Sequence, residues 1–320
     1  MIDNHFKREA MAEKIKGLHH ITAVSGPPKQ NYDFYTQVLG LRFTKKTINF
    51  DDPGTYHLYY GNYEATPGSS ITFFPWEGVP QGVPKTGEAT VVSYAVPNDS
   101  IEFWREHFKK HDIEILEDVD RFGDQRIRVK DIEGMRIEVV ESDGVDSIKP
   151  KETDEIPNIF AIRGFYGTTL SMANIGRTAE LLQEFGWSKS GEEFETTRFV
   201  SKPENHLGAV IDLKKENLSG QFGRGSVHHI AFRVPDDDTQ LAWREKLKEL
   251  GFNPTPVQDR QYFRSVYFRE PGGVLFEIAT DIPGFTKDEE LENLGTELKL
   301  PPWYEEHRRK IESSLVSLES

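Results

Sequence analysis

Two pairs of adjacent histidines offer this chain its clearest chemistry. The first pair is His19–His20 and the second is His228–His229, and an isoleucine follows each pair. In the second run, Ile230, Phe232 and Val234 alternate with other residues, as they would on one face of a strand. His229 falls on the opposite face, where it can point into a cavity while the apolar face packs against a helix. The two pairs are therefore either an accidental repeat or two ligands of one site.

A carboxylate near the end of the chain could complete such a site. Glu277 lies between Phe276 and Ile278, which flank it on the opposite face of a predicted strand. A buried carboxylate without a partner is costly, so Glu277 needs a cation or a hydrogen-bond donor. Two imidazoles and one carboxylate, here His20, His229 and Glu277, can hold a divalent metal and leave coordination positions open. The alternative is that the histidines are ordinary hydrogen-bonded residues of the strands.

The sequence gives less reason to expect metal binding by the remaining histidines. Four of them stand in charged surroundings and are predicted to lie on the surface: His5, His107, His111 and His307. His57 is predicted in a strand and His206 in a loop, and the sequence suggests a partner for neither.

The elements that position these residues form a fourfold repeat. Four units, beginning near residues 18, 87, 162 and 225, each follow the order β-α-β-β-β. Within them we expect helices at 31–39, 100–111, 175–185 and 236–250, and strands that include 113–119 and 255–258. The predicted organisation is a leader at 1–15, an N-terminal half at 16–142, a linker at 143–160, a C-terminal half at 161–283 and a charged tail at 284–320 with a helix near 304–318.

The repeat also locates a second carboxylate. Glu138 occupies the position in the second unit that Glu277 occupies in the fourth. The second and third units carry Val91 and Gly167 where the first and fourth carry histidines, so a second metal site is not expected. Glu138 should instead meet an arginine, unless it is a remnant of duplication.

Composition excludes several classes of function. The 320 residues carry a formal net charge of −14, which argues against nucleic acid or an anionic membrane as a partner. The chain has no cysteine, so any metal must be held by histidine and carboxylate. No apolar run is long enough to span a bilayer and no secretory signal begins the chain, which favours a cytoplasmic protein.

Several separated motifs resemble one known superfamily. The runs LHHIT, VHHIAF, DRQYFRSVYFREPGG and FEIATD occur in order and resemble the vicinal-oxygen-chelate superfamily, which includes glyoxalases, bleomycin-resistance proteins and extradiol dioxygenases. Within it the chain is most similar to ring-cleaving dioxygenases that act on hydroquinones. The resemblance implies an α+β fold of four βαβββ modules paired into two open cups, modules 1 with 4 and 2 with 3.

The resemblance also implies functional residues. It places Fe(II) on His20, His229 and Glu277, whereas residue chemistry alone would also admit Mn(II), Zn(II) or Ni(II). It gives supporting catalytic roles in proton transfer and charge stabilisation to four residues: His19, His228, Arg260 and Tyr267. Aromatic residues suggested for the pocket walls are Trp76, Phe222, Tyr262 and Phe263.

The function expected from the sequence is oxygen-dependent ring opening. A small hydroquinone-type aromatic and O₂ would be the partners, in quinone detoxification or aromatic catabolism. Two alternatives remain: a glyoxalase-type isomerase or thiol transferase using another metal, and a protein that binds an aromatic without catalysis. Neither the ring substituents nor whether the chain forms a homo-oligomer can be read from the sequence.

Overall fold

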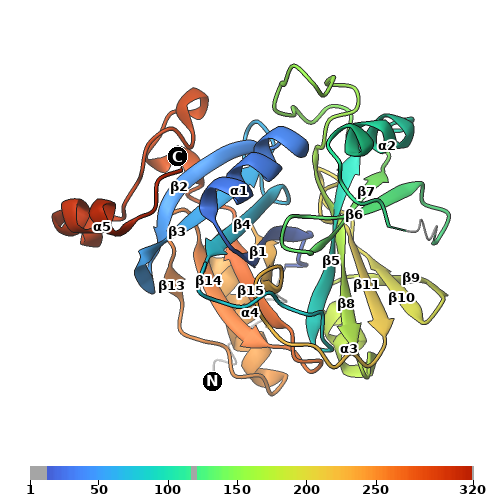
Figure 1. Ribbon diagram of the computed structural model, residues 1–320. Helices are drawn as coiled ribbons and strands as arrows, with labels where there is room; N and C mark the ends of the chain where they lie inside the picture. Colours follow the sequence, from blue (N-terminus) through green and yellow to red (C-terminus); the bar gives the residue numbers. More distant parts are fainter. Residues whose placement is uncertain (1–12, 117–120, 319–320) are drawn as a thin grey trace, which may run out of the picture.

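The computed structural model describes residues 13–116 and 121–318, and its strands form two curved sheets that lie side by side (Figure 1). The first sheet has eight strands in the order β13-β14-β15-β12-β1-β4-β3-β2, and the second has seven in the order β6-β7-β5-β8-β11-β10-β9. The first sheet thus combines modules 1 and 4, and the second combines modules 2 and 3. The predicted α+β fold and the predicted pairing of modules are confirmed. We call the concave faces of these sheets the first cup and the second cup.

The first cup is built from the two ends of the chain. Module 1 comprises β1 (Leu18–Ser25), α1 (Pro28–Asp33), the π-helix η1 (Phe34–Val38), β2 (Arg42–Asn49), β3 (Asp52–Gly61) and β4 (Ser70–Pro75). Module 4 comprises β12 (Val227–Val234), α4 (Asp237–Glu249), β13 (Gln258–Asp259), β14 (Arg264–Arg269) and β15 (Leu275–Thr280). The strands β1 and β12 pair antiparallel and join the two modules.

The second cup uses the middle of the chain. Module 2 comprises β5 (Glu88–Val96), α2 (Ile101–Lys110), β6 (Arg126–Lys130) and β7 (Arg136–Glu141). Module 3 comprises β8 (Gly164–Met172), α3 (Gly176–Glu184), β9 (Ser188–Glu193), β10 (Thr196–Val200) and β11 (Val210–Lys215). The strands β5 and β8 pair antiparallel, as β1 and β12 do in the first cup.

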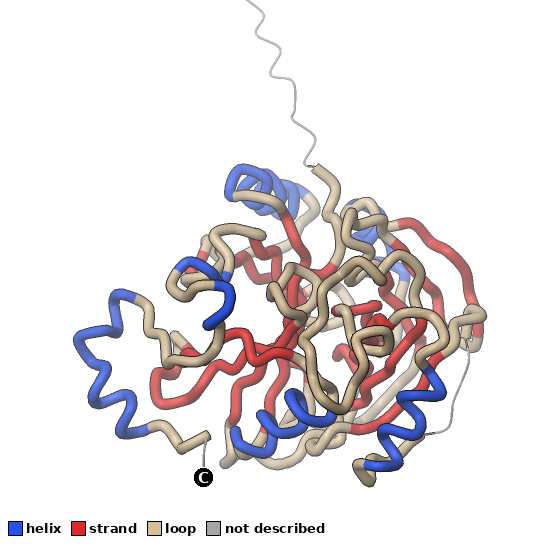
Figure 2. Tube along the Cα trace, turned by 90° about the horizontal axis from the view of Figure 1, so that it is seen from above, coloured by secondary structure: helices blue, strands red, loops and turns tan. Residues whose placement is uncertain are grey.

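The helices lie outside the strands (Figure 2). Apolar residues that alternate along the strands, such as Ile21 on β1 and Ile230 and Phe232 on β12, are buried in one large core with residues of the helices. The strands therefore turn their other faces, which carry the polar residues of interest, into the cups.

Three expected elements of the modules differ from the structure. The expected helix at 31–39 begins earlier, at Pro28, because proline is favoured in a first helical turn, and it continues as a π-helix. The expected strand at 113–119 is wrong for residues 113–116, where the backbone forms only a single bridge, from Ile115 to Val129. Residues 117–119 of this expected strand lie outside the described residues. The expected strand at 255–258 is reduced to β13, because Pro254 and Pro256 cannot donate to a ladder.

The tail is less regular than expected and partly buried. Its short helices are η2 (Phe285–Lys287), η3 (Leu291–Asn293), η4 (Pro302–His307) and α5 (Arg308–Ser314), so the expected helix near 304–318 is divided and ends early. Phe285 and Leu294 are buried in a cluster with Tyr59 and Phe263, beside the first cup. Of the residues expected to form a leader, 1–12 lie outside the described residues. None of the helices in the described part is long and apolar enough to cross a membrane.

Candidate metal centre and its cavity

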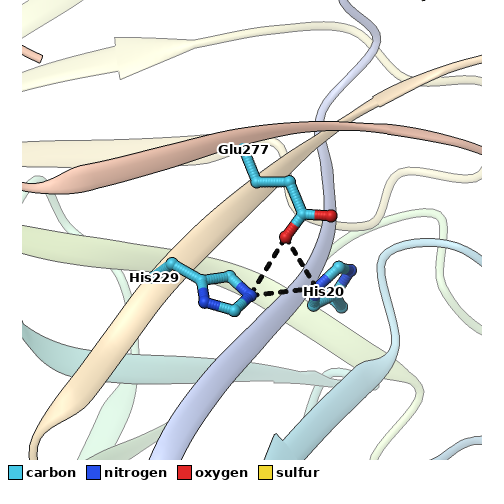
Figure 3. A group of neighbouring side chains, drawn as sticks. All are labelled: His20, His229 and Glu277. Carbon is cyan, nitrogen blue, oxygen red and sulfur yellow. Dashed lines mark hydrogen bonds and ion pairs between the residues drawn. The ribbon is translucent and has the colours of Figure 1, made fainter. Parts of the chain in front are cut away.

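Three side chains from three adjacent strands meet in the first cup (Figure 3). His20 Nε2 lies 3.2 Å from Glu277 Oε2, and His229 Nε2 lies 3.0 Å from the same oxygen. The two Nε2 atoms are 3.3 Å apart. All three side chains are buried. The structure thus brings together the three residues that the sequence proposed as ligands.

Strand pairing explains this convergence. Ala231 on β12 pairs with His20 on one side and with Glu277 on the other. A register shift between Leu18 and His20 in the β1–β12 ladder indicates a bulge, a feature that often re-aims side chains next to active sites. Because His229 lies two residues before Ala231, it shares the same face of the sheet.

The geometry fits a divalent metal. Ligands bound at about 2.1 Å in adjacent octahedral positions lie about 3 Å apart, and the three edges of this triangle are close to that length. Glu277 Oε2 has no hydrogen-bond partner among the described residues and faces both imidazoles. Three ligands on one face of an octahedron are the arrangement of the two-histidine, one-carboxylate iron sites.

The protonation states also suit metal binding. Burial alone would raise the pKa of Glu277, but the neighbouring His20 and His229 outweigh it and hold the pKa well below the usual value. Burial lowers the pKa of His229, although the charge of Glu277 opposes the shift. An ionised carboxylate and a neutral imidazole are the forms that ligate metals.

The outer histidine of each pair orients the inner one. His19 Nδ1 lies 2.9 Å from His20 Nδ1, and His228 Nδ1 lies 2.8 Å from His229 Nδ1. If each inner histidine donates from Nδ1, its Nε2 keeps a lone pair directed at the metal position. Burial, followed by the neighbouring His229, lowers the pKa of His228 to about 3, so His228 is neutral and able to accept this bond.

A serine that the sequence analysis missed positions the carboxylate. Ser265 Oγ donates to Glu277 Oε1 at 2.5 Å, which leaves Oε2 for the metal position. Ser265 lies on β14 two residues before Tyr267, and Tyr267 pairs with Glu277 across the ladder. The alternation of residues along this strand was the available signal, because it places Ser265 and Tyr267 on one face.

A cavity of about 470 Å³ opens from the metal position. It is lined by His20 and His229, by the predicted residues His228, Arg260 and Tyr267, and by several aromatic rings. Of the suggested walls, Trp76 and Phe263 line it. Phe222 lines a neighbouring cavity instead, and Tyr262 is buried behind the wall with its hydroxyl donating to Asp288. His19 is buried beside Phe263 and is not among the residues that line the cavity.

Arg260 and Tyr267 form one unit in the cavity. The Arg260 guanidinium lies over the Tyr267 ring, 5.5 Å from its centroid, and donates to Asp51 at 3.0 Å. Burial, followed by the negative charge of Glu277, raises the pKa of Tyr267. Tyr267 therefore keeps its proton and can donate a hydrogen bond beside a charged guanidinium.

His57 also belongs to this cavity, although the sequence suggested no partner for it. Its Nε2 lies 2.8 Å from Thr72 Oγ1 and its Nδ1 lies 2.9 Å from the Tyr59 hydroxyl. Thr72 continues the chain of hydrogen bonds to Thr22, two residues beyond His20, at 2.8 Å. The spacing of His57 and Tyr59 on one strand was the signal, since both must face the same side.

The prediction that His107 lies on the surface is wrong. His107 is buried, its ring stacks on Phe103, and its Nε2 lies 2.8 Å from the Val38 carbonyl oxygen. It faces inward because it follows Trp104 by three positions, on the apolar side of α2. A second group of possible metal ligands consists of His107, His111 and Glu155, which lie near one another. In this group, one ring nitrogen of His107 is already bonded to the Val38 carbonyl oxygen.

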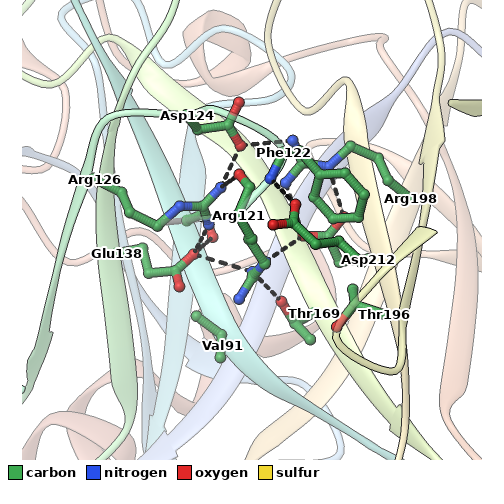
Figure 4. Close-up of polar contacts among 12 residues, drawn as sticks. Val91, Arg121, Phe122, Asp124, Arg126, Glu138, Thr169, Thr196, Arg198 and Asp212 are labelled. Carbon is green, nitrogen blue, oxygen red and sulfur yellow. Dashed lines mark hydrogen bonds and ion pairs between the residues drawn. The ribbon is translucent and has the colours of Figure 1, made fainter. Parts of the chain in front are cut away.

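The second cup holds guanidinium groups where the first holds the proposed metal ligands. Glu138 Oε2 accepts hydrogen bonds from Arg126 at 2.8 Å and from Ser93 at 2.8 Å, and lies 3.4 Å from Arg121 (Figure 4). Arg128 donates to the other oxygen at 2.9 Å. The prediction that Glu138 meets an arginine is therefore confirmed.

Comparison with known proteins finds a family model and relatives that span most of the chain. The model of the glyoxalase/bleomycin resistance protein/dioxygenase superfamily matches residues 17–139 and 142–278. A Bacillus subtilis (strain 168) protein named "Putative ring-cleaving dioxygenase MhqO" is 45% identical over 311 residues, which cover 97% of this chain and 98% of that protein. The chlorohydroquinone/hydroquinone 1,2-dioxygenase of Sphingobium indicum is 33% identical over 306 residues, covering 92% of this chain and 94% of that protein.

Solved structures show the same fold. The crystal structure of a protein titled "putative dioxygenase" from Bacillus subtilis superposes with a TM-score of 0.92 at 45% identity, covering 96% of this chain and 98% of that chain. Glyoxalase I from Zea mays shares the fold at a TM-score of 0.59 and 15% identity, covering 83% of this chain and 92% of that chain. The family model and these relatives span both cups, and the chain therefore belongs to the glyoxalase/bleomycin resistance protein/dioxygenase superfamily.

Proposed function

We propose that this protein is an Fe(II)-dependent dioxygenase that opens the ring of a hydroquinone-type aromatic, in quinone detoxification or aromatic catabolism. The observation that carries the proposal is the triangle of His20 Nε2, His229 Nε2 and Glu277 Oε2, with edges of 3.0–3.3 Å, at the end of a cavity of about 470 Å³. Three protein ligands leave room for two small molecules. Relatives named as ring-cleaving dioxygenases support the reaction class, and the Sphingobium relative supports the substrate class.

His20, His229 and Glu277 would hold the iron, which when bound supplies Lewis acidity and a route for electrons between the aromatic ring and dioxygen. The net reaction balances without an added reductant. The bond between the hydroxyl-bearing carbon and its neighbour breaks, the first carbon becomes a carboxylic acid and the second an aldehyde. The ring loses four electrons, O₂ gains them, and both oxygen atoms enter the product.

The cavity walls bind and orient the ring. Phe263 lies against His20 with ring centroids 4.8 Å apart, and Phe74 and Trp76 stack 5.3 Å apart on another wall. Flat aromatic surfaces of this kind favour a flat substrate and exclude water from it. The hydroxyl group remote from the metal position would meet the polar wall that includes His57 and Asp51.

Tyr267 and His228 would handle protons. The Tyr267 phenol, kept protonated by burial, would donate a hydrogen bond to oxygen atoms as they gain negative charge. Arg260, over the same ring, would stabilise that charge. His228 Nδ1 is occupied by His229, which leaves a proton on Nε2 for the cavity. For His19, which lies away from the cavity, we propose only the orientation of His20.

A paired substitution tests the proposal. The protein is loaded anaerobically with Fe(II), and oxygen uptake is measured with hydroquinone, methyl- and chlorohydroquinone, and catechol. His229→Ala should lose iron and oxygen uptake. Val91→Ala, the equivalent position in the second cup, should keep both. Thermal melting controls for folding.

Three outcomes would reject the proposal. One is unchanged iron content and oxygen uptake in His229→Ala. A second is isomerisation of a thiol adduct without oxygen uptake, which would indicate a glyoxalase-type enzyme. A third is saturable binding of hydroquinone by the iron-loaded protein with no oxygen consumed, which would indicate a binding protein.

A further inference from the structure

The second cup contains a cavity of its own, remote from the proposed metal centre in the fold. Its volume is about 180 Å³, below the roughly 300–1,000 Å³ of pockets for drug-sized ligands, so it suits a small molecule. Four cationic side chains and one carboxylate line it: Arg121, Arg128, Arg136, Lys214 and Glu216. Lys214 and Glu216 form an ion pair at 2.7 Å, which leaves the three arginines to define the charge of the cavity.

The charged side chains packed next to this cavity include more cations than anions. Four guanidinium groups share three carboxylates in one cluster, which consists of Arg121, Arg126, Arg128, Arg198, Asp124, Glu138 and Asp212. Figure 4 labels all of these residues except Arg128. Arg121 and Arg126 are both buried. A buried positive surplus is costly unless an anion compensates it. The surplus stands out because the whole chain carries a net charge of −14.

Arg136 adds a guanidinium group that is free to bind. It lies on β7 two residues before Glu138, so it faces the same cup, and it pairs with Val91 of β5 in the ladder. Within the described part of the chain, no hydrogen bond or ion pair to its side chain occurs. A free guanidinium beside a cavity can donate two parallel hydrogen bonds to one carboxylate.

A strained aromatic residue completes the cavity. Phe194 and Glu195 connect β9 to β10 as a two-residue turn, with φ values of +44° and +59°. Turns with positive φ at both positions favour asparagine and glycine, and a bulky residue rarely adopts this conformation. Phe194 is nevertheless 72% exposed and lines the cavity, so no packing in the described structure accounts for the strain. Strain of this kind is found at ligand sites.

We propose that the second cup binds a small, flat, unsaturated carboxylate. The carboxylate would meet Arg136 together with the cavity-facing Arg121 and Arg128, and the flat body of the ligand would lie against Phe194. This site would be separate from the metal centre and does not depend on the reaction proposed for the first cup.

Benzoate is a suitable probe, and its neutral analogue benzamide is the matched control ligand. Isothermal titration of the full-length protein should show saturable binding of one benzoate per chain and no binding of benzamide. Arg136→Gln should weaken benzoate binding about 10- to 100-fold, because a hydrogen bond to a charged group is lost. Phe194→Gly should also weaken it while leaving the melting temperature equal or higher, because glycine adopts positive φ without strain.

Arg260→Gln serves as the control variant, since Arg260 is the arginine of the first cavity. It should leave benzoate affinity unchanged. The proposal is overturned if benzoate affinity falls in Arg260→Gln but not in Arg136→Gln, if benzamide binds as well as benzoate, or if no benzoate binds.

Discussion

Replacement of Ser265 by alanine should weaken metal binding without removing a metal ligand. Ser265 Oγ donates to Glu277 Oε1 at 2.5 Å, while Oε2 points at the two imidazoles. Without this bond, the carboxylate can rotate about its terminal torsion and Oε2 loses its fixed place in the triangle. The variant Ser265→Ala should therefore keep all three ligands and bind Fe(II) less tightly.

The size of the effect follows from the bond that is lost. A hydrogen bond to a charged group is worth about 1.5–3 kcal/mol, which corresponds to roughly a 10- to 150-fold change in affinity. Loss of an outer hydrogen bond at metal sites typically costs about 10- to 100-fold. Because Ser265 and Glu277 are both fully buried, water cannot readily replace the hydroxyl. We therefore expect the Kd for iron to rise about 10- to 100-fold.

The second cup provides the control. Ser93 Oγ donates to Glu138 Oε2 at 2.8 Å, so it also makes a buried serine–glutamate bond, although from β5 and not from the strand that corresponds to β14. Ser93→Ala removes this buried bond away from the metal centre. Both variants are titrated anaerobically with Fe(II) against a chelator of known affinity, and their urea unfolding is compared. Equal iron affinity in Ser265→Ala, Ser93→Ala and the wild type would refute this role of Ser265.

Three further predictions concern the catalytic wall, the second cup and the tail. Tyr267→Phe should retain iron by elemental analysis and slow hydroquinone-dependent oxygen uptake about 100-fold, because one donor to developing charge is lost; normal uptake would contradict the proposed role. Burial alone would raise the pKa of Glu138, but Arg121, Arg126 and Arg128 lower this pKa to about 2, below the ordinary glutamate value of 4.5. A carboxyl group whose pKa is lower in the folded state than in the unfolded state stabilises the fold at a pH above the unfolded-state pKa, so Glu138→Gln should lower the free energy of unfolding by about 3 kcal/mol at pH 7. Measured by urea unfolding, the difference in this free energy between the variant and the wild type should become smaller from pH 4.5 to pH 2. A difference that does not change with pH would contradict this. Lys45→Met should lower the free energy of unfolding in the same assay by about 3–5 kcal/mol, because Lys45 is fully buried and its loss leaves Asp288 and Glu289 without their cation. A decrease of less than about 1 kcal/mol would argue against a stabilising role for these ion pairs.

The fold and the ligand triangle were predictable because both depend on the alternation of residues in strands. Ile230 and Phe232 place one face of β12 in the core, so His229 must face the cup. Glu277 lies between Phe276 and Ile278 for the same reason. The repeat then relates the ends of the chain, and the family resemblance supplied the pairing of module 1 with module 4.

Contacts between side chains of different strands were harder to predict. Alternation places Ser265 on the same face as Tyr267, but it does not show that the serine hydroxyl donates to Glu277 on the neighbouring strand. The bond of His57 to Thr72 depends on the register of β3 and β4, which a sequence pattern does not fix. His107 was misplaced because its charged neighbours in sequence point to solvent while its own ring faces Phe103.

The pairing of β1 with β12 has a consequence for biosynthesis. His20 is translated early, but β12 and β15, which carry its two partners, lie at residues 227–234 and 275–280. Until those strands leave the ribosome, β1 has a neighbour only on its β4 side and exposes an open sheet edge, a known route to aggregation. The iron that we propose for this site should therefore enter only after the nascent chain is nearly finished, and a fragment that stops before β12 should precipitate without binding the metal.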